Sequence, residues 1–367
     1  MMKCRMLAAL MLLVTPAAAQ VRKEIRLPDP PGYKILKCDF HIHTVFSDGL
    51  VWPTVRVDEA WREGLDAIAI TDHIEYRPHK ENVVGNHNRP FELAEGRARH
   101  HNILLVRGAE ITRDTPPGHF NVLFTQDNQP LDTKDFYEVF DHAAAQKAFI
   151  MWNHPGWQGP ERGRWGEEQT RLLEKGRLHA IEICNGDEYY IDAHRMATER
   201  GLPMMGSSDI HEPAPTDGQK ADGHRTMTLV LAKDKSLPAL RDALDAGRTV
   251  VWYRNLLIGR EPQLKAVFDA CLRVESLHPP QAKTTYVKLT NQCDNDIELE
   301  RIQPGQPRKI TVPAQASVMV RLSGPDGQAT EKVTYKALNF LTGVDQPLTV
   351  EIAIPRPASQ PASAAAR

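Results

Sequence analysis

The feature that most constrains the fold is the regular alternation of short apolar runs with helix-like segments between about residues 33 and 250. Several runs are continuously apolar, as is typical of strands in a parallel sheet that helices cover on both faces. This order predicts an α/β domain, either a barrel or a doubly wound sheet. The expected strands are Ile35–Phe40, Ala67–Thr71, Ile103–Ile111, Phe120–Phe124, Phe149–Trp152, Ala180–Ile183, Met204–Ser208 and Met227–Leu231. The expected helices are Thr54–Glu63, Phe91–His101, Lys134–Gln146, Glu167–Glu174, Tyr189–Glu199 and Ser236–Ala246.

The pattern changes after about residue 262 to runs in which apolar and polar residues alternate, separated by Asn, Gly and Pro. This pattern predicts a small antiparallel β-sandwich. We expect an α/β domain at 20–262, a β domain at 263–355 and a low-complexity, disordered tail at 356–367. The β region holds one histidine, His278, so chemistry that needs several histidines must belong to the first domain.

The first residues have the features of a secretory signal peptide, which we place at 1–19. Lys3 and Arg5 precede an apolar run, and Ala17-Ala18-Ala19 gives the small-residue pattern of a cleavage site. No later stretch approaches the roughly 20 apolar residues that a membrane helix needs. We therefore expect a soluble chain without a membrane span, exported to the periplasm or secreted.

The charge balance argues against a long nucleic acid as the partner. Without Lys3 and Arg5, 43 basic residues face 47 acidic ones, a formal charge of −4 with no basic stripe for a long nucleic acid. A small anionic substrate remains compatible with this balance.

Cys38 and Cys184 lie in apolar runs and should be buried free thiols. The spacing of Cys271 and Cys293 leaves a disulfide open, and no C-x-x-C metal motif is present.

Nearly every expected strand of the first domain ends in a residue that can bind a metal. The first strand runs into DFHIHTVFSDG (residues 39–49), and TDH, GAEIT, GHFNVL, NHPGW and SSDIHE mark later strand ends. Imidazole and carboxylate are ligands of Zn²⁺, Mn²⁺ and Fe²⁺, and ligands in parallel α/β folds gather at the carboxyl ends of strands. Taken singly, His119 could be an ordinary loop residue and Asp48 could shape a turn. Together the pattern predicts a multinuclear metal site built from His41, His43, Asp48, His73, Glu110, His119, His154, Asp209 and His211.

Strand geometry gives a reason for the paired ligands. Side chains two residues apart in a strand project from the same face, so His41 and His43 should point together, as should Asp209 and His211. Two such pairs from distant strands can converge on one cation.

These motifs, in this order across residues 35–250, resemble those of the PHP superfamily, the polymerase and histidinol phosphatase family of metal-dependent phosphoesterases. The resemblance implies a distorted (β/α)7 barrel that holds two or three divalent ions of Mn, Zn or Fe. It implies that one ion is held by His41, His43, Glu110 and Asp209, a second by Glu110, His119 and His154, and a third by Asp48, His73 and His211. Some relatives have His at the position of Asp48. The exported chain with its β-rich second domain resembles secreted bacterial phosphodiesterases that attack organophosphate diesters.

Ions in such a cluster lower the pKa of bound water and stabilise the negative charge that builds on a phosphoryl group. We expect hydrolysis of a small phosphate diester by a hydroxide that bridges the ions, with His73 and His211 in the catalytic centre. Asp72 is expected to orient a neighbouring ligand, or alternatively to cap a helix. The alternatives are a phosphomonoesterase, a nuclease acting on short oligonucleotides, and a periplasmic module that binds metal or phosphate without turnover.

Substrate contacts are less constrained by the sequence. The candidates for contact with phosphate oxygens are Asn185 at an expected strand end, Arg77 shortly after another, and Arg225, which follows His224, with ordinary solvated or salt-bridged side chains as the alternative. Trp152, Trp157 and Trp165 either wall a pocket for an aryl or alkyl ester or pack in the core. The sequence leaves the oligomeric state open.

Overall fold

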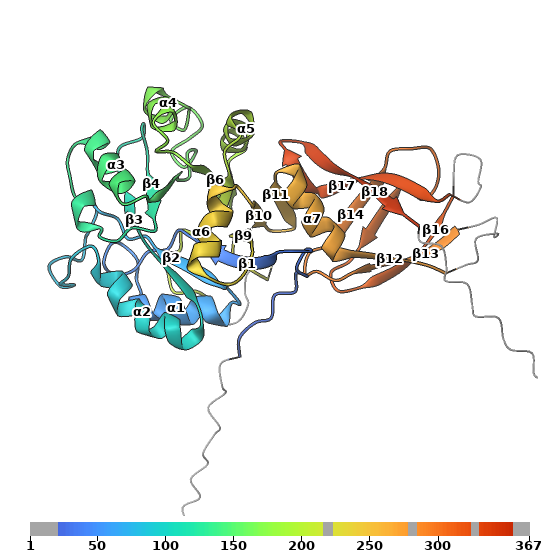
Figure 1. The fold of residues 1–367 in the computed structure, drawn as a ribbon, viewed down its shortest axis with the longest axis horizontal. Coiled ribbons are helices and arrows are strands. Elements are labelled where there is room, and N and C mark those ends of the chain that lie inside the picture. The colour runs from blue at the N-terminus through green and yellow to red at the C-terminus, as the bar shows by residue number, and fades with distance from the viewer. Residues whose placement is uncertain (1–20, 216–222, 278–284, 324–329, 355–367) are drawn as a thin grey trace, which may run out of the picture.

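The computed structural model describes residues 21–215, 223–277, 285–323 and 330–354. Two lobes lie side by side, the α/β domain in blue to yellow and the β domain in orange to red (Figure 1). The predicted order of an α/β domain followed by a β-sandwich is confirmed. The expected signal peptide at 1–19, His278 and the tail at 356–367 lie outside the described residues. Among the described helices, none is long and apolar enough to cross a membrane.

Seven strands form a distorted barrel in the first domain. Six of them pair in series, the last pairs with the sixth, and the segments that follow the first and last strands meet in a parallel bridge between Ile42 and Ile210. The Asp209 amide donates to the His41 carbonyl (2.9 Å), and the His43 amide donates to the Ile210 carbonyl (3.1 Å), which reinforces this closure. The barrel strands are β1 (Lys34–Asp39), β2 (Ala67–Ile70), β3 (Leu104–Ile111), β4 (Phe120–Leu123), β5 (Phe149–Trp152), β6 (Ala180–Asn185) and β8 (Met204–Ser207).

The distortion comes from β4, which runs antiparallel to both of its neighbours, β3 and β5. Residues 112–119 connect β3 to β4 without a helix, and a parallel crossover needs a longer connection. The reversal places the start of β4 at the rim where β3 ends. His119, which precedes β4, therefore reaches the same end of the barrel as the residues that follow the parallel strands.

Helices cover the outside of the barrel, as the continuously apolar strands predicted. All residues of β2, β4 and β5 are buried, consistent with packing on both faces. Asp135 caps α3 by accepting from the amides of Tyr137 and Glu138. The helices are α1 (Pro53–Arg62), α2 (Arg89–His101), η1 (Gln129–Leu131), α3 (Phe136–Ala145), α4 (Glu167–Glu174), α5 (Ile191–Arg200) and α6 (Leu237–Asp245).

Three antiparallel strands extend the barrel sheet away from the barrel. The strand β9 (Met227–Ala232) pairs antiparallel with β1, although the sequence pattern suggested another parallel strand. Next come β10 (Thr249–Tyr253) and β11 (Leu256–Gly259), which the sequence analysis missed. A short strand β7 (Glu188–Tyr189) forms a hairpin with β6.

The second domain is a β-sandwich preceded by α7 (Glu261–Cys271), a helix that the sequence analysis also missed. One sheet contains β12, β13 and β16, and the other contains β15, β14, β17 and β18. The expected boundary between residues 262 and 263 falls inside α7. The strands are β12 (Leu272–Ser276), β13 (Thr285–Asn291), β14 (Ile297–Arg301), β15 (Lys309–Val312), β16 (Ser317–Leu322), β17 (Lys332–Gly343) and β18 (Gln346–Ala353).

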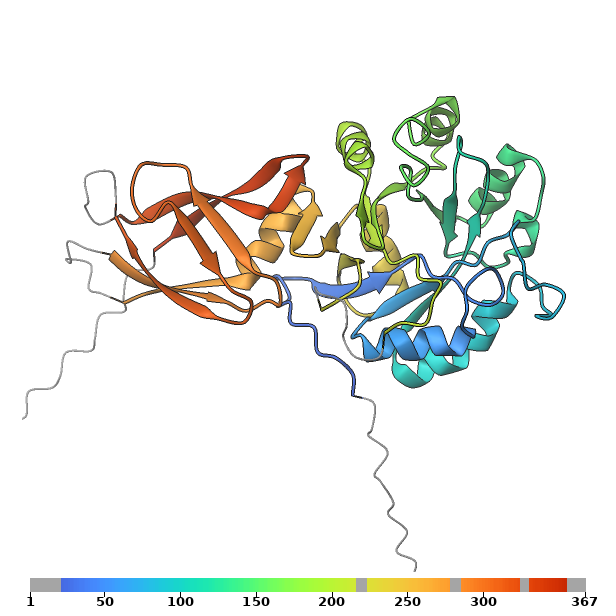
Figure 2. The ribbon, with the colours of Figure 1, turned by 180° about the vertical axis from the view of Figure 1, so that it is seen from behind.

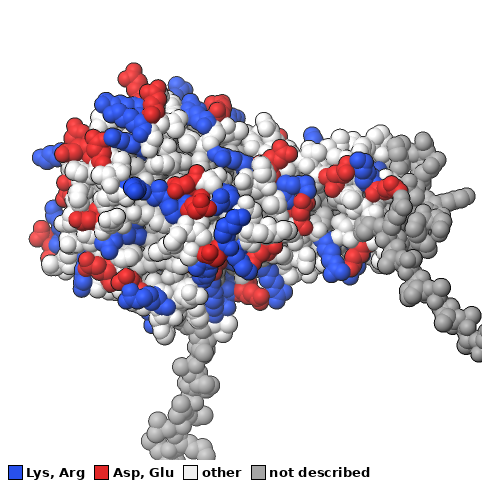
Figure 3. Space-filling model, in the orientation of Figure 1, with Lys and Arg blue, Asp and Glu red and all other residues white. Residues whose placement is uncertain are grey.

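The two domains are joined by backbone hydrogen bonding as well as by packing. Strand β17 pairs parallel with β11, so one continuous sheet runs from the sandwich into the barrel. The first described segment of the chain, in dark blue, passes between the two lobes (Figure 2). In this segment the Arg26 amide donates to the Asp294 carboxylate of the second domain (2.8 Å). Cys271 and Cys293 form a disulfide, whereas Cys38 and Cys184 are buried free thiols as predicted. Acidic and basic side chains are interspersed on the face drawn in Figure 3.

Candidate metal centre

The nine residues predicted as metal ligands gather at one rim of the barrel. His41 and His43 follow β1, His73 follows β2, His154 follows β5, and Glu110 lies near the end of β3. Both expected pairs lie past the ends of their strands, His41 and His43 after β1 and Asp209 and His211 after β8, so the strand period that we used to pair them does not apply. The backbone of Asp209 is left-handed, with φ of 50°.

The SDG sequence of the first motif folds the loop tightly onto the ligand His43. The amides of Ser47 and Gly49 both donate to the Thr44 carbonyl at 3.0 Å. A Cβ at Gly49 would lie 2.6 Å from the carbonyl carbon of His43, so only glycine fits. This turn directs Asp48 back toward the histidines.

Glu110 is the centre of the cluster. Its carboxylate is fully buried and lies within ion-pair distance of five imidazoles: those of His41, His43, His73, His119 and His154. The Oε1 atom lies 3.4 Å from His41 Nε2 and 3.1 Å from His119 Nδ1. The Oε2 atom lies 3.4 Å from His43 Nε2 and 2.7 Å from His73 Nδ1. A carboxylate with imidazoles on both oxygens has the arrangement needed to bridge two ions.

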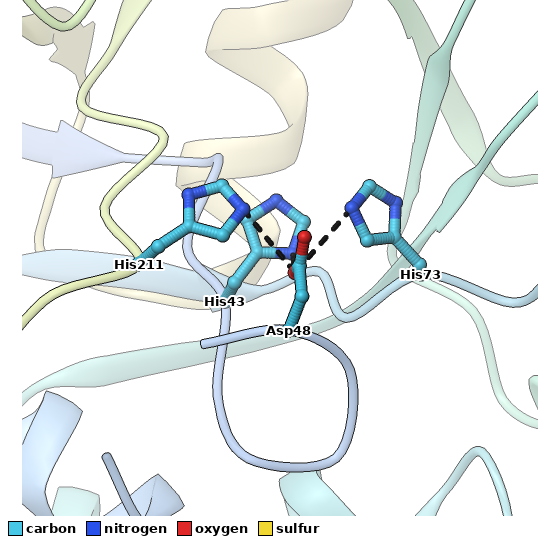
Figure 4. Close-up of side chains that lie close together, drawn as sticks. All are labelled: His43, Asp48, His73 and His211. Carbon is cyan, nitrogen blue, oxygen red and sulfur yellow. Dashed lines mark ion pairs between the residues drawn. The ribbon is translucent and has the colours of Figure 1, made fainter. Parts of the chain in front are cut away.

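A second group lies around Asp48, as Figure 4 shows. Asp48 Oδ1 lies 3.2 Å from His211 Nε2, 3.5 Å from His73 Nε2 and 3.7 Å from His43 Nδ1. Asp209 Oδ1 lies 3.0 Å from His43 Nε2 and 3.2 Å from His41 Nε2. All nine residues belong to four overlapping groups of three or four residues. Within each group, the ligand atoms lie within 4.8 Å of one another.

The unsatisfied atoms of the cluster fit several divalent ions. Among the described residues, His41 Nε2, His43 Nε2, Asp48 Oδ1, Glu110 Oε2 and Asp209 Oδ1 are buried and have no hydrogen-bond partner. Buried polar atoms are nearly always paired, so orphaned imidazole and carboxylate atoms that converge indicate a cation site. His154, with φ of 27°, also adopts a strained backbone conformation of the kind that concentrates at functional sites.

Electrostatics favours ionised carboxylates at this rim. Burial alone would raise the pKa of Glu110, but the imidazoles of His73 and His41 outweigh burial and hold this pKa well below its ordinary value. The same balance of burial against His41 and His43 holds the pKa of Asp209 well below its ordinary value. Both groups are therefore negatively charged at neutral pH, as metal ligands must be.

Comparison with known proteins decides the family. The chain is 44% identical to a crystallised two-domain protein of Bacteroides vulgatus that contains a predicted PHP-like metal-dependent phosphoesterase. The match covers 92% of this chain and 100% of that protein, with a TM-score of 0.87. This chain belongs to the PHP-like metal-dependent phosphoesterases. Residues 272–353 match the DUF5001 family, an Ig-like domain. The chain is also 27% identical to an uncharacterized protein of Methanocaldococcus jannaschii over 192 residues, 48% of this chain and 83% of that protein.

In this PHP-like phosphoesterase a second layer of polar residues, which the sequence analysis missed, orients the ligands. Glu182 is fully buried in β6, and its Oε1 lies 3.3 Å from His41 Nδ1. Its Oε2 accepts from the His154 amide at 2.9 Å. Asn153 donates to Glu110 Oε1 at 2.9 Å. Partners of this kind fix the ring orientation and tautomer of metal-binding histidines. The signal for Glu182 was visible, because it is the one charged residue in the apolar run AIEICN.

Two further polar residues hold the ligand-bearing loops. Asp72 accepts from the Thr44 amide (2.6 Å) and from the Ser47 hydroxyl (2.7 Å), and Ser47 Oγ lies 3.2 Å from His43 Nδ1. Asp72 thus supports His43 through Ser47. Arg56 of α1 is buried and donates to the carbonyls of His43 (2.8 Å) and Ile210 (3.0 Å), which ties the loops after β1 and β8 together. No sequence signal identified Arg56.

Two of the three predicted substrate contacts do not face the centre. Arg225 is buried between Asp39 (2.9 Å) and Glu63 (2.6 Å), so its role as a phosphate contact is wrong. Arg77 donates to the carbonyls of Phe46 (3.2 Å) and Gly85 (2.8 Å) and braces a loop behind His73 instead. Asn185 does lie beside the centre, where it donates to Asp209 Oδ2 at 3.2 Å. Its contact with substrate remains a prediction.

The ligand rim opens into a cleft of about 520 Å³, within the size range of small-molecule sites. Asp48, His73, His119, His154 and His211 form part of its floor, and Asn185 lies on its wall. Of the three predicted tryptophans, Trp157 lines this cleft, whereas Trp152 is buried in the core with Trp165 packed against it. Of the two alternatives, packing in the core therefore holds for Trp152 and Trp165, whereas Trp157 lines the cleft.

Proposed function

We propose that this PHP-like phosphoesterase hydrolyses small phosphate diesters, organophosphate diesters among them. The observation that carries the proposal is the cluster of orphaned ligand atoms around Glu110 at the floor of an open cleft. When bound there, two or three ions of Mn, Zn or Fe would activate water and stabilise the charge that develops on phosphorus.

The charge of the cleft supports a diester over a monoester. Among the described residues that line it, Arg113 is the one arginine or lysine, and its guanidinium contacts the Glu75 carboxylate. Asp114 adds a further negative charge to the lining. A phosphate monoester carries up to two negative charges at neutral pH, whereas a diester carries one. Beyond the charge that the ions themselves would supply, the side chains of the cleft offer little free positive charge for the second negative charge of a monoester, which favours the diester.

The residues of the chain divide the remaining tasks. His73 and His211 stand beside Asp48, at the side of the cluster that faces the cleft, and belong to the catalytic centre. Asp72 positions His43 through Ser47. Asn185 lines the cleft, where its amide nitrogen donates to Asp209 (3.2 Å) and to Glu182 (3.0 Å), so a contact with a phosphoryl oxygen would require one of these two bonds to be exchanged.

We further propose that the protein works outside the cytoplasm. The leader-like residues 1–19 support export to the periplasm or secretion. The interspersed surface charge supports a small-molecule substrate and not a long nucleic acid (Figure 3).

The proposal is tested by comparing bis(4-nitrophenyl) phosphate with 4-nitrophenyl phosphate, using protein reconstituted separately with Mn²⁺, Zn²⁺ and Fe²⁺. We expect a higher kcat/KM for the diester with at least one of these metals. A profile confined to monoesters would contradict the diesterase. Protein that binds metal and phosphate esters but turns over none of them would instead support a binding module.

A further inference from the structure

Two aromatic side chains stand exposed inside the cleft. Tyr76 is 52% exposed and Trp157 is 48% exposed, and both line the cleft above the metal ligands. The Tyr76 ring lies edge-on to the His73 ring at 5.9 Å. The Trp157 ring lies 5.6 Å from the His119 ring and 5.8 Å from the His154 ring. Each ring is thus anchored on a ligand histidine and leaves about half of its surface open.

The two rings stand against histidines that contact different oxygens of Glu110. His73, which Tyr76 contacts, lies beside Glu110 Oε2, whereas His119 and His154, which Trp157 contacts, lie beside Oε1. Both rings line the same cleft. A phosphoryl group held over Glu110 would therefore have an aromatic ring against the histidines at each of the two oxygens.

The loop that carries Trp157 is held by a backbone hydrogen bond and by the packing of Tyr190. The Trp157 amide donates to the His154 carbonyl at 3.1 Å, which forms a turn directly after the ligand. A Cβ at Gly156 would lie 2.6 Å from the Tyr190 ring, so glycine allows Tyr190 to pack against this turn. The Tyr190 hydroxyl donates to Glu188 at 2.6 Å. The turn and the Tyr190 ring hold the backbone of Trp157 in position while its indole stays about half exposed.

We propose that Tyr76 and Trp157 form two stacking subsites, each of which takes one planar aromatic arm of a phosphate diester. This inference rests on the proposed diesterase function and specifies its substrate as a diester with aryl groups or other flat rings. A diester carries two organic arms on phosphorus, which matches two exposed rings that stand against different ligand histidines of one cleft. Stacking removes apolar ring surface from water and adds a specific ring–ring contact.

The binding test uses two anions without an ester bond, diphenylphosphinate and dimethylphosphinate, titrated calorimetrically into the metal-loaded protein. Both carry one negative charge, and they differ only in the two arms. We expect diphenylphosphinate to bind about tenfold more tightly than dimethylphosphinate, because each stacked ring should raise the affinity roughly a few-fold. Trp157→Ala and Tyr76→Ala should each weaken diphenylphosphinate binding about fivefold, and dimethylphosphinate binding much less. Trp157→Phe and Tyr76→Phe should retain most of the preference.

The matched control is Tyr286→Ala, which removes a 38% exposed aromatic side chain from β13 of the Ig-like domain and should change neither affinity. Equal affinities of the wild-type protein for the two phosphinates would overturn the proposal. An equal loss for both phosphinates in the alanine variants would also overturn it, because it would mean that the rings only support the ligand histidines.

Turnover separates this inference from the proposed function. Methyl, phenyl and thymidine 4-nitrophenyl phosphates share one leaving group and differ in the other arm. A lower KM for the phenyl and thymidine esters supports subsites for any flat ring, and a lower KM for the phenyl ester alone supports subsites for aryl esters. Turnover of all three with equal KM overturns the subsites and leaves the diesterase intact. If the metal-loaded protein hydrolyses none of them, the diesterase proposal fails and the subsites fail with it.

Discussion

The two domains use buried polar groups differently. In the barrel, His41, His43 and Glu110 are fully buried, and several ligand atoms that lack a hydrogen-bond partner converge on one another. In the Ig-like domain, the buried side chain of Asn291 donates to three backbone carbonyls and accepts from the Cys293 amide. Asn339 likewise bonds backbone groups on both sides of the domain junction. These two amides hold backbone segments together, whereas the converging imidazoles and carboxylates of the barrel rim have the arrangement of a cation site.

The largest expected effect comes from removing a barrel ligand. His41→Ala and Asp209→Ala should each empty a metal position and abolish phosphodiester hydrolysis, because His41 belongs to two of the ligand groups and Asp209 Oδ1 lies beside both His41 and His43. The fold should persist, since neither residue contributes to the apolar core. Elemental analysis, initial rates and circular dichroism check these three expectations.

The control for the ligand variants is Asp269→Ala in α7, which removes an exposed carboxylate paired with Lys265. It should leave both the metal content and the rate unchanged. Full metal content and full rate in the two ligand variants would contradict the assignment of the barrel rim as the metal centre.

A smaller effect, on stability alone, is expected from the disulfide of the second domain. Cys271 and Cys293 are separated by 22 residues and tie the end of α7 to the loop after β13. The double variant Cys271→Ser with Cys293→Ser should lower the free energy of unfolding by about 3 kcal/mol through the gain in unfolded-chain entropy. Chemical denaturation measures this loss, and kcat of the folded variant should stay at the wild-type value. A lower kcat in protein that remains folded would show that the second domain shapes the active site.

The contrast between the domains also explains what the sequence could predict. Metal ligands at strand ends were visible because each lies next to an apolar run in the chain. The environment of Arg225 was not visible, because its partners Asp39 and Glu63 are distant in sequence. Local sequence shows which side chains carry charge but not which charges neutralise one another.

Two elements that the sequence analysis did not list, α7 and β17, show different limits of local patterns. In α7, Leu264, Val267, Phe268 and Cys271 follow helical spacing, a signal that was present but unused because the region had been placed in the β domain. Strand β17 interrupts its alternation at its end, where Phe340 and Leu341 pair with β11 of the other domain. The end of β17 is apolar because it pairs with a strand of the first domain, and the alternation expected within one domain does not predict this pairing.

The smallest expected effect tests the second layer of the barrel, at Glu182. The proton on His41 Nδ1 can be donated to the Glu182 carboxylate, which leaves Nε2 free to bind an ion beside Glu110 and Asp209. In Glu182→Gln, the amide group can instead donate to Nδ1 and favour the tautomer whose Nε2 carries the proton. We expect metal affinity to fall about 10- to 100-fold, the range for such outer partners, and kcat to recover at saturating metal.

Titration with a competing chelator measures the metal affinity of Glu182→Gln. Glu174→Gln, which changes an exposed carboxylate at the end of α4, is the control and should bind metal as the wild type does. Unchanged affinity in Glu182→Gln would mean that packing alone orients His41. A lower kcat that excess metal does not restore would instead place Glu182 in the reaction itself, because a residue that acts only through metal affinity loses its effect once every site is filled.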